Sequence, residues 1–241
     1  MNLAVDMGNS RTKLAVFEAD KLIFEQCCEE LTKEFLCEIL KKFDVKNSII
    51  SSVTHNKREI ISFLKKCTNF VELTNEMSVN LKINYLTPNT LGRDRIAAAV
   101  GALKILPQSD ILTVDIGSCI TMDLVTADRV FNGGNIAPGF LMRITAMHDY
   151  TAKLPIVKPQ IPENIFGKST ADAVLCGAFW GIVSEINSLY IRLKENFPQL
   201  KIIITGGDAR YFEKYINNCE KFVPDLVLLG LNTILRTIYK N

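Results

Sequence analysis

The sequence has no Cys-x-x-Cys pair, and its seven cysteines are an odd number scattered along 241 residues. Zinc sites and redox motifs place cysteines in close pairs, and disulfide-stapled domains carry an even set. A disulfide framework and a structural zinc site are therefore not expected. We expect reduced thiols, as in cytoplasmic proteins. The two histidines, His55 and His148, are far apart and have no partners at ligand spacing, so they predict no metal site.

A block of basic residues is also missing. The chain has 28 Lys and Arg against 26 Asp and Glu, a formal charge of +2. A nucleic-acid-binding face normally needs clustered Lys and Arg. Pairs such as Lys41-Lys42 and Lys65-Lys66 fit the ends of helices, where they complement the helix dipole. Nucleic acid is therefore not an expected partner.

No apolar run reaches the ~18 residues of a membrane span, and the chain begins with a strand-like segment rather than a basic leader. A membrane is therefore not an expected partner, and we expect a soluble, cytoplasmic protein. Hydrophobic residues make up 48% and charged residues 22%, which is typical of globular domains. This length suits one large domain or two small ones with a sizeable core.

What the sequence does contain is an internal repeat. Residues 3–6 and 111–115 are apolar runs that each end in Asp and lead into a glycine turn. Both segments read Asp-x-Gly-Asn/Ser-x-x-Thr, from Asp6 to Thr12 and from Asp115 to Thr121. Each continues into a second strand that ends near an Asp-basic turn. Such a repeat of one supersecondary unit predicts a duplicated α/β domain, divided into residues 1–109 and 110–241.

The rest of the chain alternates between helical and strand patterns. Apolar periodicity predicts helices over residues 30–43, 56–67, 92–105, 169–196 and 225–239. Residues 75–91, with Pro88, suggest a loop over a site. Residues 133–139 are expected to form a glycine-rich loop before a helix.

The Asp-x-Gly hairpins have a chemistry suited to polyphosphates. A carboxylate at a strand end lies at the mouth of a site, and the glycine lets a phosphate approach backbone amides. Lys13 adds a point charge. Asp6 and Asp115 supply the oxygen ligands that Mg²⁺ prefers. One Asp-x-Gly alone is also an ordinary strand-to-turn sequence, so the repetition in a matching context is what favours a phosphate site.

A glycine pair, Gly206-Gly207, follows the apolar run 201–205 and precedes Asp208. It allows backbone to pack flat against a nucleotide. It also fits an ordinary strand-to-helix turn that Asp208 caps, and the two roles are compatible. The sequence has neither the Gly-x-Gly-x-x-Gly fingerprint nor the Gly-Lys-Ser/Thr of a P-loop.

The segment Gly92-Arg93-Asp94-Arg95 begins a predicted helix. Its spacing alone favours an acidic residue stabilised by the helix dipole. The alternative is a general base that accepts a proton from a substrate hydroxyl near the phosphate site. An adjacent arginine would then bind a substrate carboxylate. These residues alone leave both interpretations open.

Taken in order, the motifs resemble those of type III pantothenate kinases, which belong to the acetate and sugar kinase/Hsc70/actin superfamily. The hairpins fit the whole superfamily, whereas the Tyr-x-x-Pro-x-x-Leu-Gly-x-Asp-Arg segment at residues 85–95 is more specific. The resemblance implies an α/β fold of two duplicated ribonuclease H-like (actin-like ATPase) domains, each a mixed sheet with flanking helices, with a nucleotide cleft between them. The second domain would carry the Thr-Gly-Gly-Asp-Ala nucleotide loop at residues 205–209.

The resemblance also implies roles for individual residues. Asp94 would be the catalytic base, and Asp115 would bind a monovalent cation, K⁺ or NH₄⁺. The ATP-binding residues would be Asp6, Met7, Gly8, Asn9, Ser10, Arg11, Thr12, Lys13 and Ser118. The pantothenate pocket would be lined by Tyr85, Gly92, Arg93, Asp94, Arg95 and Thr170. The family usually has Thr at Ser10 and Ser118, which retain a hydroxyl, and an acidic residue at Leu229, for which no role follows.

The implied activity is ATP- and Mg²⁺-dependent phosphorylation of the primary hydroxyl of pantothenate. The product would be 4′-phosphopantothenate, in the first step of coenzyme A biosynthesis, formed by in-line transfer in a cytoplasmic homodimer. Two other functions stay open. One is another small-molecule or sugar kinase of the same superfamily, which a substrate panel distinguishes. The other is a nucleotide-binding regulator without kinase activity, against which the intact Asp6, Asp94 and Asp115 argue.

Overall fold

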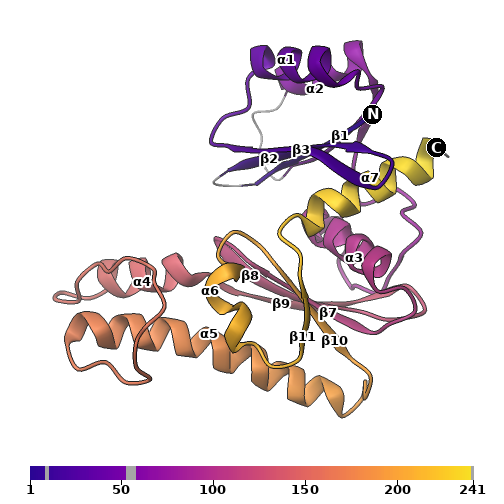
Figure 1. The fold of residues 1–241 in the computed structure, drawn as a ribbon. Coiled ribbons are helices and arrows are strands. Elements are labelled where there is room, and N and C mark those ends of the chain that lie inside the picture. Colours follow the sequence, from indigo (N-terminus) through magenta and orange to yellow (C-terminus); the bar gives the residue numbers. More distant parts are fainter. Residues whose placement is uncertain (9–10, 53–57, 240–241) are drawn as a thin grey trace. The chain divides into compact units, whose positions relative to one another are not determined.

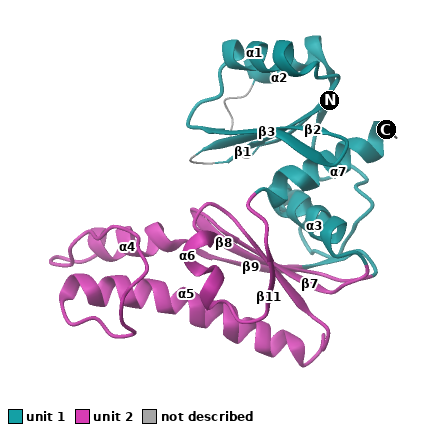
Figure 2. Ribbon diagram, in the orientation of Figure 1, with its two compact units in different colours: residues 1–107, 128–132, 225–241 teal, residues 108–127, 133–224 magenta. Residues whose placement is uncertain are grey.

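The computed structural model of the chain describes residues 1–8, 11–52 and 58–239, which form two compact units (Figure 2). Unit 1 contains Met1–Pro107, Asp128–Asn132 and Asp225–Asn241, and unit 2 contains Gln108–Ala127 and Gly133–Pro224. The repeat predicts a division of the chain into two duplicated halves at residues 109 and 110, and this division stays a prediction. Two segments of residues 110–241 belong to unit 1: Asp128–Asn132, and Asp225–Asn241 with the last helix.

The first sheet has the strand order β3-β2-β1-β4-β5 (Figure 1). Its strands are β1 (Asn2–Met7), β2 (Thr12–Glu18), β3 (Lys21–Cys28), β4 (Asn47–Ser52) and β5 (Asn69–Glu72). The first three are antiparallel neighbours, and β4 and β5 run parallel to β1. Helices α1 (Lys33–Phe43) and α2 (Arg58–Cys67) lie on one side, and α3 (Arg93–Ile105) and α7 (Leu226–Tyr239) lie on the other.

The second sheet has the order β11-β10-β7-β8-β9-β6. Its strands are β6 (Lys82–Ile83), β7 (Ile111–Ile116), β8 (Cys119–Val125), β9 (Val130–Pro138), β10 (Lys201–Thr205) and β11 (Cys219–Phe222). Strands β7 and β8 are antiparallel, and β10 and β11 run parallel to β7. From β9 to β11 the order third-second-first-fourth-fifth repeats that of the first sheet. Two mixed sheets of matching order confirm the duplicated α/β fold.

The glycine-rich segment predicted as a loop at residues 133–139 is instead the second part of β9. A Cβ on Gly134 would collide with the backbone of Met122 and the carboxylate of Asp123. Glycine therefore serves here to let β9 run close to β8, which is a recognised use of glycine inside a strand.

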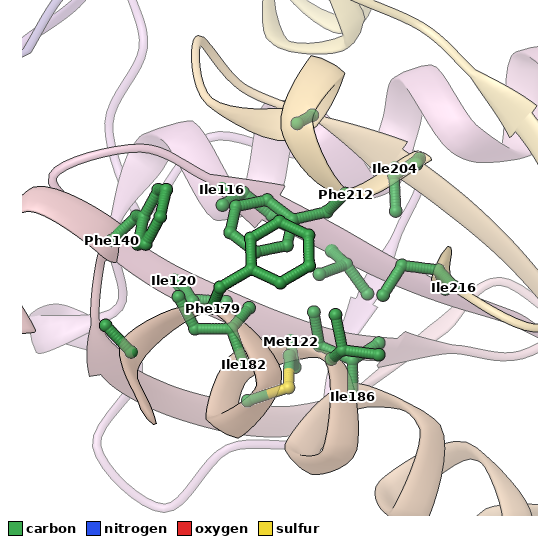
Figure 3. Packing of buried hydrophobic residues seen from close by; sticks show 14 of the residues in the cluster. Ile116, Ile120, Met122, Phe140, Phe179, Ile182, Ile186, Ile204, Phe212 and Ile216 are labelled. Carbon is green, nitrogen blue, oxygen red and sulfur yellow. The ribbon is translucent and has the colours of Figure 1, made fainter. Parts of the chain in front are cut away.

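The core of unit 2 is built on α5 (Thr170–Lys194), α4 (Phe140–Asp149) and the short α6 (Ala209–Phe212) (Figure 3). Phe179 of α5 stacks on Phe212 with ring centroids 4.8 Å apart, and Phe140 meets both rings edge-on. Among the described residues, α5 alone has the length and apolar composition of a membrane span. Half of its apolar window is buried in this core, which accounts for its composition.

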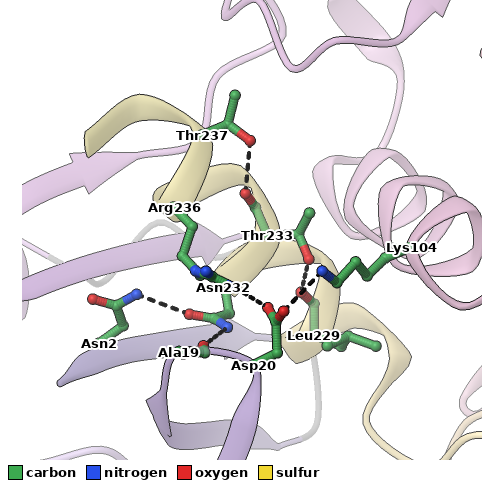
Figure 4. A network of polar contacts seen from close by, with 9 residues as sticks. All are labelled: Asn2, Ala19, Asp20, Lys104, Leu229, Asn232, Thr233, Arg236 and Thr237. Atoms are coloured by element: carbon green, nitrogen blue, oxygen red, sulfur yellow. Dashed lines mark hydrogen bonds and ion pairs between the residues drawn. The ribbon is translucent and has the colours of Figure 1, made fainter. Parts of the chain in front are cut away.

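In unit 1 a chain of side-chain amides joins the sheet to α7. Asn69 donates to Asn47, Asn47 donates to Asn2, and Asn2 donates to Asn232 of α7, each at 3.0 Å. Asn232 in turn donates to the backbone carbonyl of Ala19 in the β2–β3 turn (Figure 4). Because buried amides are costly when unpaired, this continuous chain fixes α7 against the sheet of unit 1.

Candidate active site

The first Asp-x-Gly hairpin lies in unit 1, at the end of β1. Asp6 stands opposite Lys13 of β2 in the strand register. The turn is closed by the Gly8 amide, which donates to the Arg11 carbonyl at 3.1 Å. A Cβ on Gly8 would lie 3.1 Å from that same oxygen, so the tight turn favours glycine. An acidic and a basic side chain therefore lie opposite each other on the two strands that this turn connects.

The other residues expected to contact ATP on this hairpin differ in accessibility. Met7 and Thr12 are buried within the strands, whereas Arg11 is exposed. Asn9 and Ser10 lie outside the described residues. The structure therefore describes the two strands of this hairpin. The role of Asn9 and Ser10 in binding ATP stays a prediction.

The second hairpin lies in unit 2 and is surrounded by glycine turns. Its own turn is closed by the Gly117 amide, which donates to the Cys119 carbonyl at 3.0 Å. The Gly139 amide, at the start of α4, donates to the Ser118 carbonyl at 3.1 Å. A Cβ on Gly139 would overlap the carbonyls of Gly117 and Ser118, so only glycine fits. The exposed Ser118 therefore lies in a turn whose backbone is hydrogen-bonded to Gly139 at the start of α4.

The Gly206-Gly207 turn meets the same hairpin from β10. The Asp208 amide donates to the Ile116 carbonyl at 2.9 Å. Gly206 has a φ of +100°, and a Cβ there would collide with the Asp115 carboxylate and the Ile116 carbonyl. Gly117 and Gly206 therefore lie beside the Asp115 carboxylate, and Gly139 packs against the backbone of residues 117–118. This is a cradle that a phosphate chain can approach closely.

Asp94 lies in the first turn of α3, in unit 1. One of its carboxylate oxygens accepts a hydrogen bond from the Arg95 amide at 2.9 Å. A Cβ on Gly92, the N-cap residue of the helix, would collide with that same oxygen. Glycine at position 92 therefore leaves the space that the Asp94 carboxylate occupies. In this position the Asp94 carboxylate can interact favourably with the helix dipole. The same position does not prevent it from acting as a base.

Arg93 ties the start of α3 to the sheet. Its Nη1 donates to the Ser52 carbonyl at 3.1 Å, at the end of β4. Ser52 is the register partner of Met7 at the end of β1. The helix start that carries Asp94 is therefore joined to the strand ends that carry the first hairpin, and unit 1 brings these predicted residues together.

Arg95 is nearly fully buried, at 5% exposure. Its guanidinium lies 5.8 Å from the ring centre of Tyr85 and 5.6 Å from that of Phe131. The two rings meet edge-on at 6.2 Å. Arg95 therefore anchors Tyr85 through cation–π contacts, which gives it a structural role beside any contact with substrate.

Thr170, the remaining expected substrate residue, is exposed at the first position of α5. The helix is capped by Ser169, whose hydroxyl accepts from the Asp172 amide at 3.1 Å. Thr170 belongs to unit 2, whereas the other substrate residues belong to unit 1. Its part in the site stays a prediction.

Sequence reasoning missed two polar features of unit 1. Asn75 makes three side-chain hydrogen bonds to the residue 88–93 region, and no local pattern signals contacts between segments this far apart. Glu25 of β3 meets Asp225, and the hydrogen bond between the carboxyls, together with burial, raises the pKa of Glu25. The positive charge of Lys13 opposes that rise, which places Lys13 next to an acidic pair.

A magnesium ion that is bound together with a nucleotide needs few protein ligands. Among the described residues no three His, Cys, Asp or Glu side chains gather at metal-binding distance. Mg²⁺ is commonly held by one or two carboxylates together with phosphate oxygens and water. Asp6 and Asp115, each beside a glycine turn, are carboxylates of that kind.

The fold is that of the actin-like ATPases and sugar kinases. The chain is similar to a ROK family glucokinase from Streptomyces griseus in complex with glucose and AMPPNP, with a TM-score of 0.54, 12% identity and coverage of 98% and 99% of the two chains. It is also similar to the activator of the 2-hydroxyisocaproyl-CoA dehydratase from Clostridium difficile with bound ADPNP, with a TM-score of 0.56, 12% identity and coverage of 99% and 95%. These likenesses establish the fold.

The sequence comparisons are more specific. Residues 2–192 match the family model described as type III pantothenate kinase. The chain is 37% identical to type III pantothenate kinases from Christiangramia forsetii, over 239 residues, and Phocaeicola vulgatus, over 236 residues, with 98% of every chain covered. The chain therefore belongs to the type III pantothenate kinase family and is a kinase.

Proposed function

We propose that this chain transfers the γ-phosphoryl group of ATP to the primary hydroxyl of pantothenate. The product would be 4′-phosphopantothenate, and the reaction would be the first step of coenzyme A biosynthesis. Membership of the family carries the proposal, because two relatives of this name are 37% identical over nearly the whole chain. The intact Asp6, Asp94 and Asp115, each beside a glycine turn, support a catalytic chain over a regulator without activity.

In this proposal Asp94 acts as the general base. Its carboxylate would hold the substrate hydroxyl in line with the γ-phosphorus and take its proton as the new P–O bond forms. The leaving group is the β-phosphate oxygen of ADP. Lys13 and the backbone amides of the glycine turns would stabilise the charge of the transferring group. Mg²⁺ bound with ATP would neutralise part of the phosphate charge.

Positioning supplies much of the rate in phosphoryl transfer. The start of α3 is suited to it because Gly92 leaves room for the Asp94 carboxylate and Arg93 fixes the helix to β4. We further propose K⁺ or NH₄⁺ at Asp115, a cytoplasmic location that suits seven free cysteines, and a homodimer. Light scattering after gel filtration tests the last of these.

A coupled assay of ADP release tests the substrate. Purified protein is given ATP, Mg²⁺ and K⁺ with pantothenate, glucose or N-acetylglucosamine in parallel. We expect ADP release with pantothenate alone, and a product heavier by one phosphoryl group in mass spectrometry. Release with a sugar but not with pantothenate would favour the sugar kinase alternative. Nucleotide binding without turnover on any acceptor would favour the regulatory one.

A further inference from the structure

The side-chain amide of Asn75, in the turn that follows β5, makes three hydrogen bonds to one neighbouring segment. Its NH₂ group donates to the Pro88 carbonyl at 2.6 Å and to the Leu91 carbonyl at 2.8 Å. Its carbonyl oxygen accepts from Nε of Arg93 at 3.4 Å. Residues 88–93 thus receive two hydrogen bonds from Asn75 and give one to it. An amide can make all three, whereas an ionised carboxylate has no donor.

The segment that Asn75 holds is the one that leads into the candidate base. Pro88–Thr90 forms a single 3₁₀ turn, in which the Leu91 amide donates to the Pro88 carbonyl at 3.1 Å. Leu91 is buried and directly precedes Gly92, the N-cap residue of α3. Fixing the carbonyls at both ends of this turn therefore fixes the point from which the Asp94 turn starts.

Arg93 extends the same arrangement to the sheet. Its Nε donates to Asn75, and its Nη1 donates to the Ser52 carbonyl at the end of β4. One guanidinium thus bridges the Asn75 amide and the strand end next to the first hairpin. A planar guanidinium with donors on different nitrogens suits such a bridge better than an ammonium group does.

We propose that Asn75 is a positioning residue of the kinase site, which holds the 88–91 turn and Arg93 so that Asp94 faces the acceptor hydroxyl. The inference rests on the proposed function for its kinetic consequence. Asn75 acts through residues 88–93 and touches no reacting atom. Its loss should therefore affect the hydroxyl substrate more than the nucleotide, since the segment it holds includes the expected acceptor-binding residues.

Asn75→Asp is the most informative variant. It keeps the size of the side chain and the oxygen that accepts from Arg93, but it removes both donors to the Pro88 and Leu91 carbonyls. Asn89→Asp is the matched control, because it adds the same charge within the same turn at an exposed side chain. Asn75→Ala, which adds no charge, replaces Asn75→Asp if that variant does not fold by circular dichroism.

Steady-state kinetics gives the first result. We expect kcat/KM for pantothenate to fall tenfold or more in Asn75→Asp, with KM for ATP changed less than twofold and Asn89→Asp close to the unsubstituted protein. A purely structural role would reduce only the amount of active enzyme, so kcat per ATP-binding site, counted by calorimetric titration, and both KM values would stay unchanged. That pattern, or equal rises in KM for ATP and for pantothenate, would overturn the proposal.

Amide hydrogen exchange gives a result that does not depend on the substrate. The Thr90 and Leu91 amides are hydrogen-bonded within the turn. We expect their exchange to become at least tenfold faster in Asn75→Asp and to stay unchanged in Asn89→Asp. Unchanged exchange in Asn75→Asp would overturn the positioning role. If the unsubstituted protein does not phosphorylate pantothenate, the proposed function fails, and the exchange experiment still decides whether Asn75 holds the turn.

Discussion

The carboxylate of Asp20, in the β2–β3 turn, accepts a hydrogen bond from the ammonium group of Lys104 at 2.8 Å (Figure 4). Lys104 belongs to α3, which begins one residue before Asp94. The same carboxylate also pairs with Arg236 of α7. Within unit 1, one turn residue therefore connects the helix that carries the candidate base with the last helix of the chain.

Asp20→Asn should lower the stability of unit 1 in a pH-dependent way. The hydrogen bond from Arg236, and then that from Lys104, lowers the pKa of Asp20 below its ordinary 3.8. A carboxyl whose pKa is lower in the folded state stabilises the fold above its unfolded pKa, and this contribution disappears as pH falls through the folded pKa. Because the side chains are partly exposed, we expect ~0.5–1 kcal/mol at pH 7.

Urea denaturation at pH 7 and at pH 3 or below measures this difference. The gap between the unsubstituted protein and Asp20→Asn should narrow at the lower pH and in 1 M NaCl, where salt screens exposed pairs. Glu29→Gln, at an exposed carboxylate, controls for the loss of one negative charge. A gap that is the same at both pH values would contradict the ion-pair explanation.

Gly230→Ala should destabilise the protein by forcing the backbones of α3 and α7 apart. A Cβ at position 230 would overlap the Ala97 carbonyl and lie 3.1 Å from the Gly101 amide nitrogen, so the two helix backbones have no room for it. Overpacking of this kind costs ~1–3 kcal/mol. Gly177→Ala in α5 is the control, because no atom beyond the adjacent residues and the nearby backbone of its own helix lies within 4 Å of its added Cβ. There alanine should stabilise the helix by ~0.5–1 kcal/mol.

Thermal unfolding of both glycine variants measures these effects. We expect a lower midpoint for Gly230→Ala and an unchanged or higher midpoint for Gly177→Ala. If Gly230→Ala were as stable as the unsubstituted protein, the close packing of the two helix backbones would be wrong.

Ser51→Ala should stabilise the protein. Ser51 is fully buried in β4, and its hydroxyl has no hydrogen-bond partner in the described part of the chain. A buried hydroxyl without a partner costs ~1–3 kcal/mol, and alanine removes it with little loss of volume. Ser48→Ala on the same strand is the control, because the equally buried Ser48 hydroxyl lies 2.6 Å from that of Thr68.

Chemical denaturation should therefore give opposite signs for the two serine variants. We expect a gain of about 1 kcal/mol for Ser51→Ala and a loss of similar size for Ser48→Ala. A stability loss in Ser51→Ala would show that its hydroxyl is satisfied in solution. A stability gain accompanied by lower turnover would give that hydroxyl a part in the reaction.

Local patterns were enough to predict the duplicated hairpins and the start of α3. Both depend on neighbours in sequence: an apolar strand that ends in Asp-x-Gly, and a helix that begins after Gly92. Strand β9 was missed over residues 133–138 because glycines normally mark turns, whereas Gly134 is required by the nearness of β8. A local pattern cannot report a neighbour that is close only in space.

The same reason explains why the surroundings of the site were not predicted. In the sequence Asn75 is an ordinary loop residue, and only the structure shows the hydrogen bonds of its amide to residues 88–93. The packing of α7 within unit 1 depends on Asn232, whose amide partner Asn2 stands at the other end of the chain. Motifs therefore indicated which residues carry chemistry, while the residues that hold them in place required the tertiary structure.

Potassium should stimulate turnover if Asp115 holds a monovalent cation as proposed. The Asp115 carboxylate and the Ile116 carbonyl both lie next to Gly206, which places two oxygen ligands beside one glycine turn. We expect ADP release with pantothenate to be several-fold faster in K⁺ or NH₄⁺ than in Na⁺ at equal ionic strength. Asp115→Asn should raise the K⁺ concentration needed for half-maximal rate. Equal rates in K⁺ and Na⁺ buffers would remove the cation from the proposal.

Asp94→Asn should separate nucleotide binding from phosphoryl transfer. Asparagine keeps the oxygen that accepts from the Arg95 amide, so the start of α3 should form as before, but it cannot take a proton from the acceptor hydroxyl. Loss of a general base typically costs 10²–10⁴-fold in rate, and we expect a fall of that size in kcat. The dissociation constant for ATP, measured by calorimetry, should change little. Glu59→Gln, at an exposed acidic residue in the first turn of α2, is the control and should keep full activity. Turnover near that of the unsubstituted protein in Asp94→Asn would leave Asp94 with only its role at the helix start, and the base would have to be sought among other groups of the site.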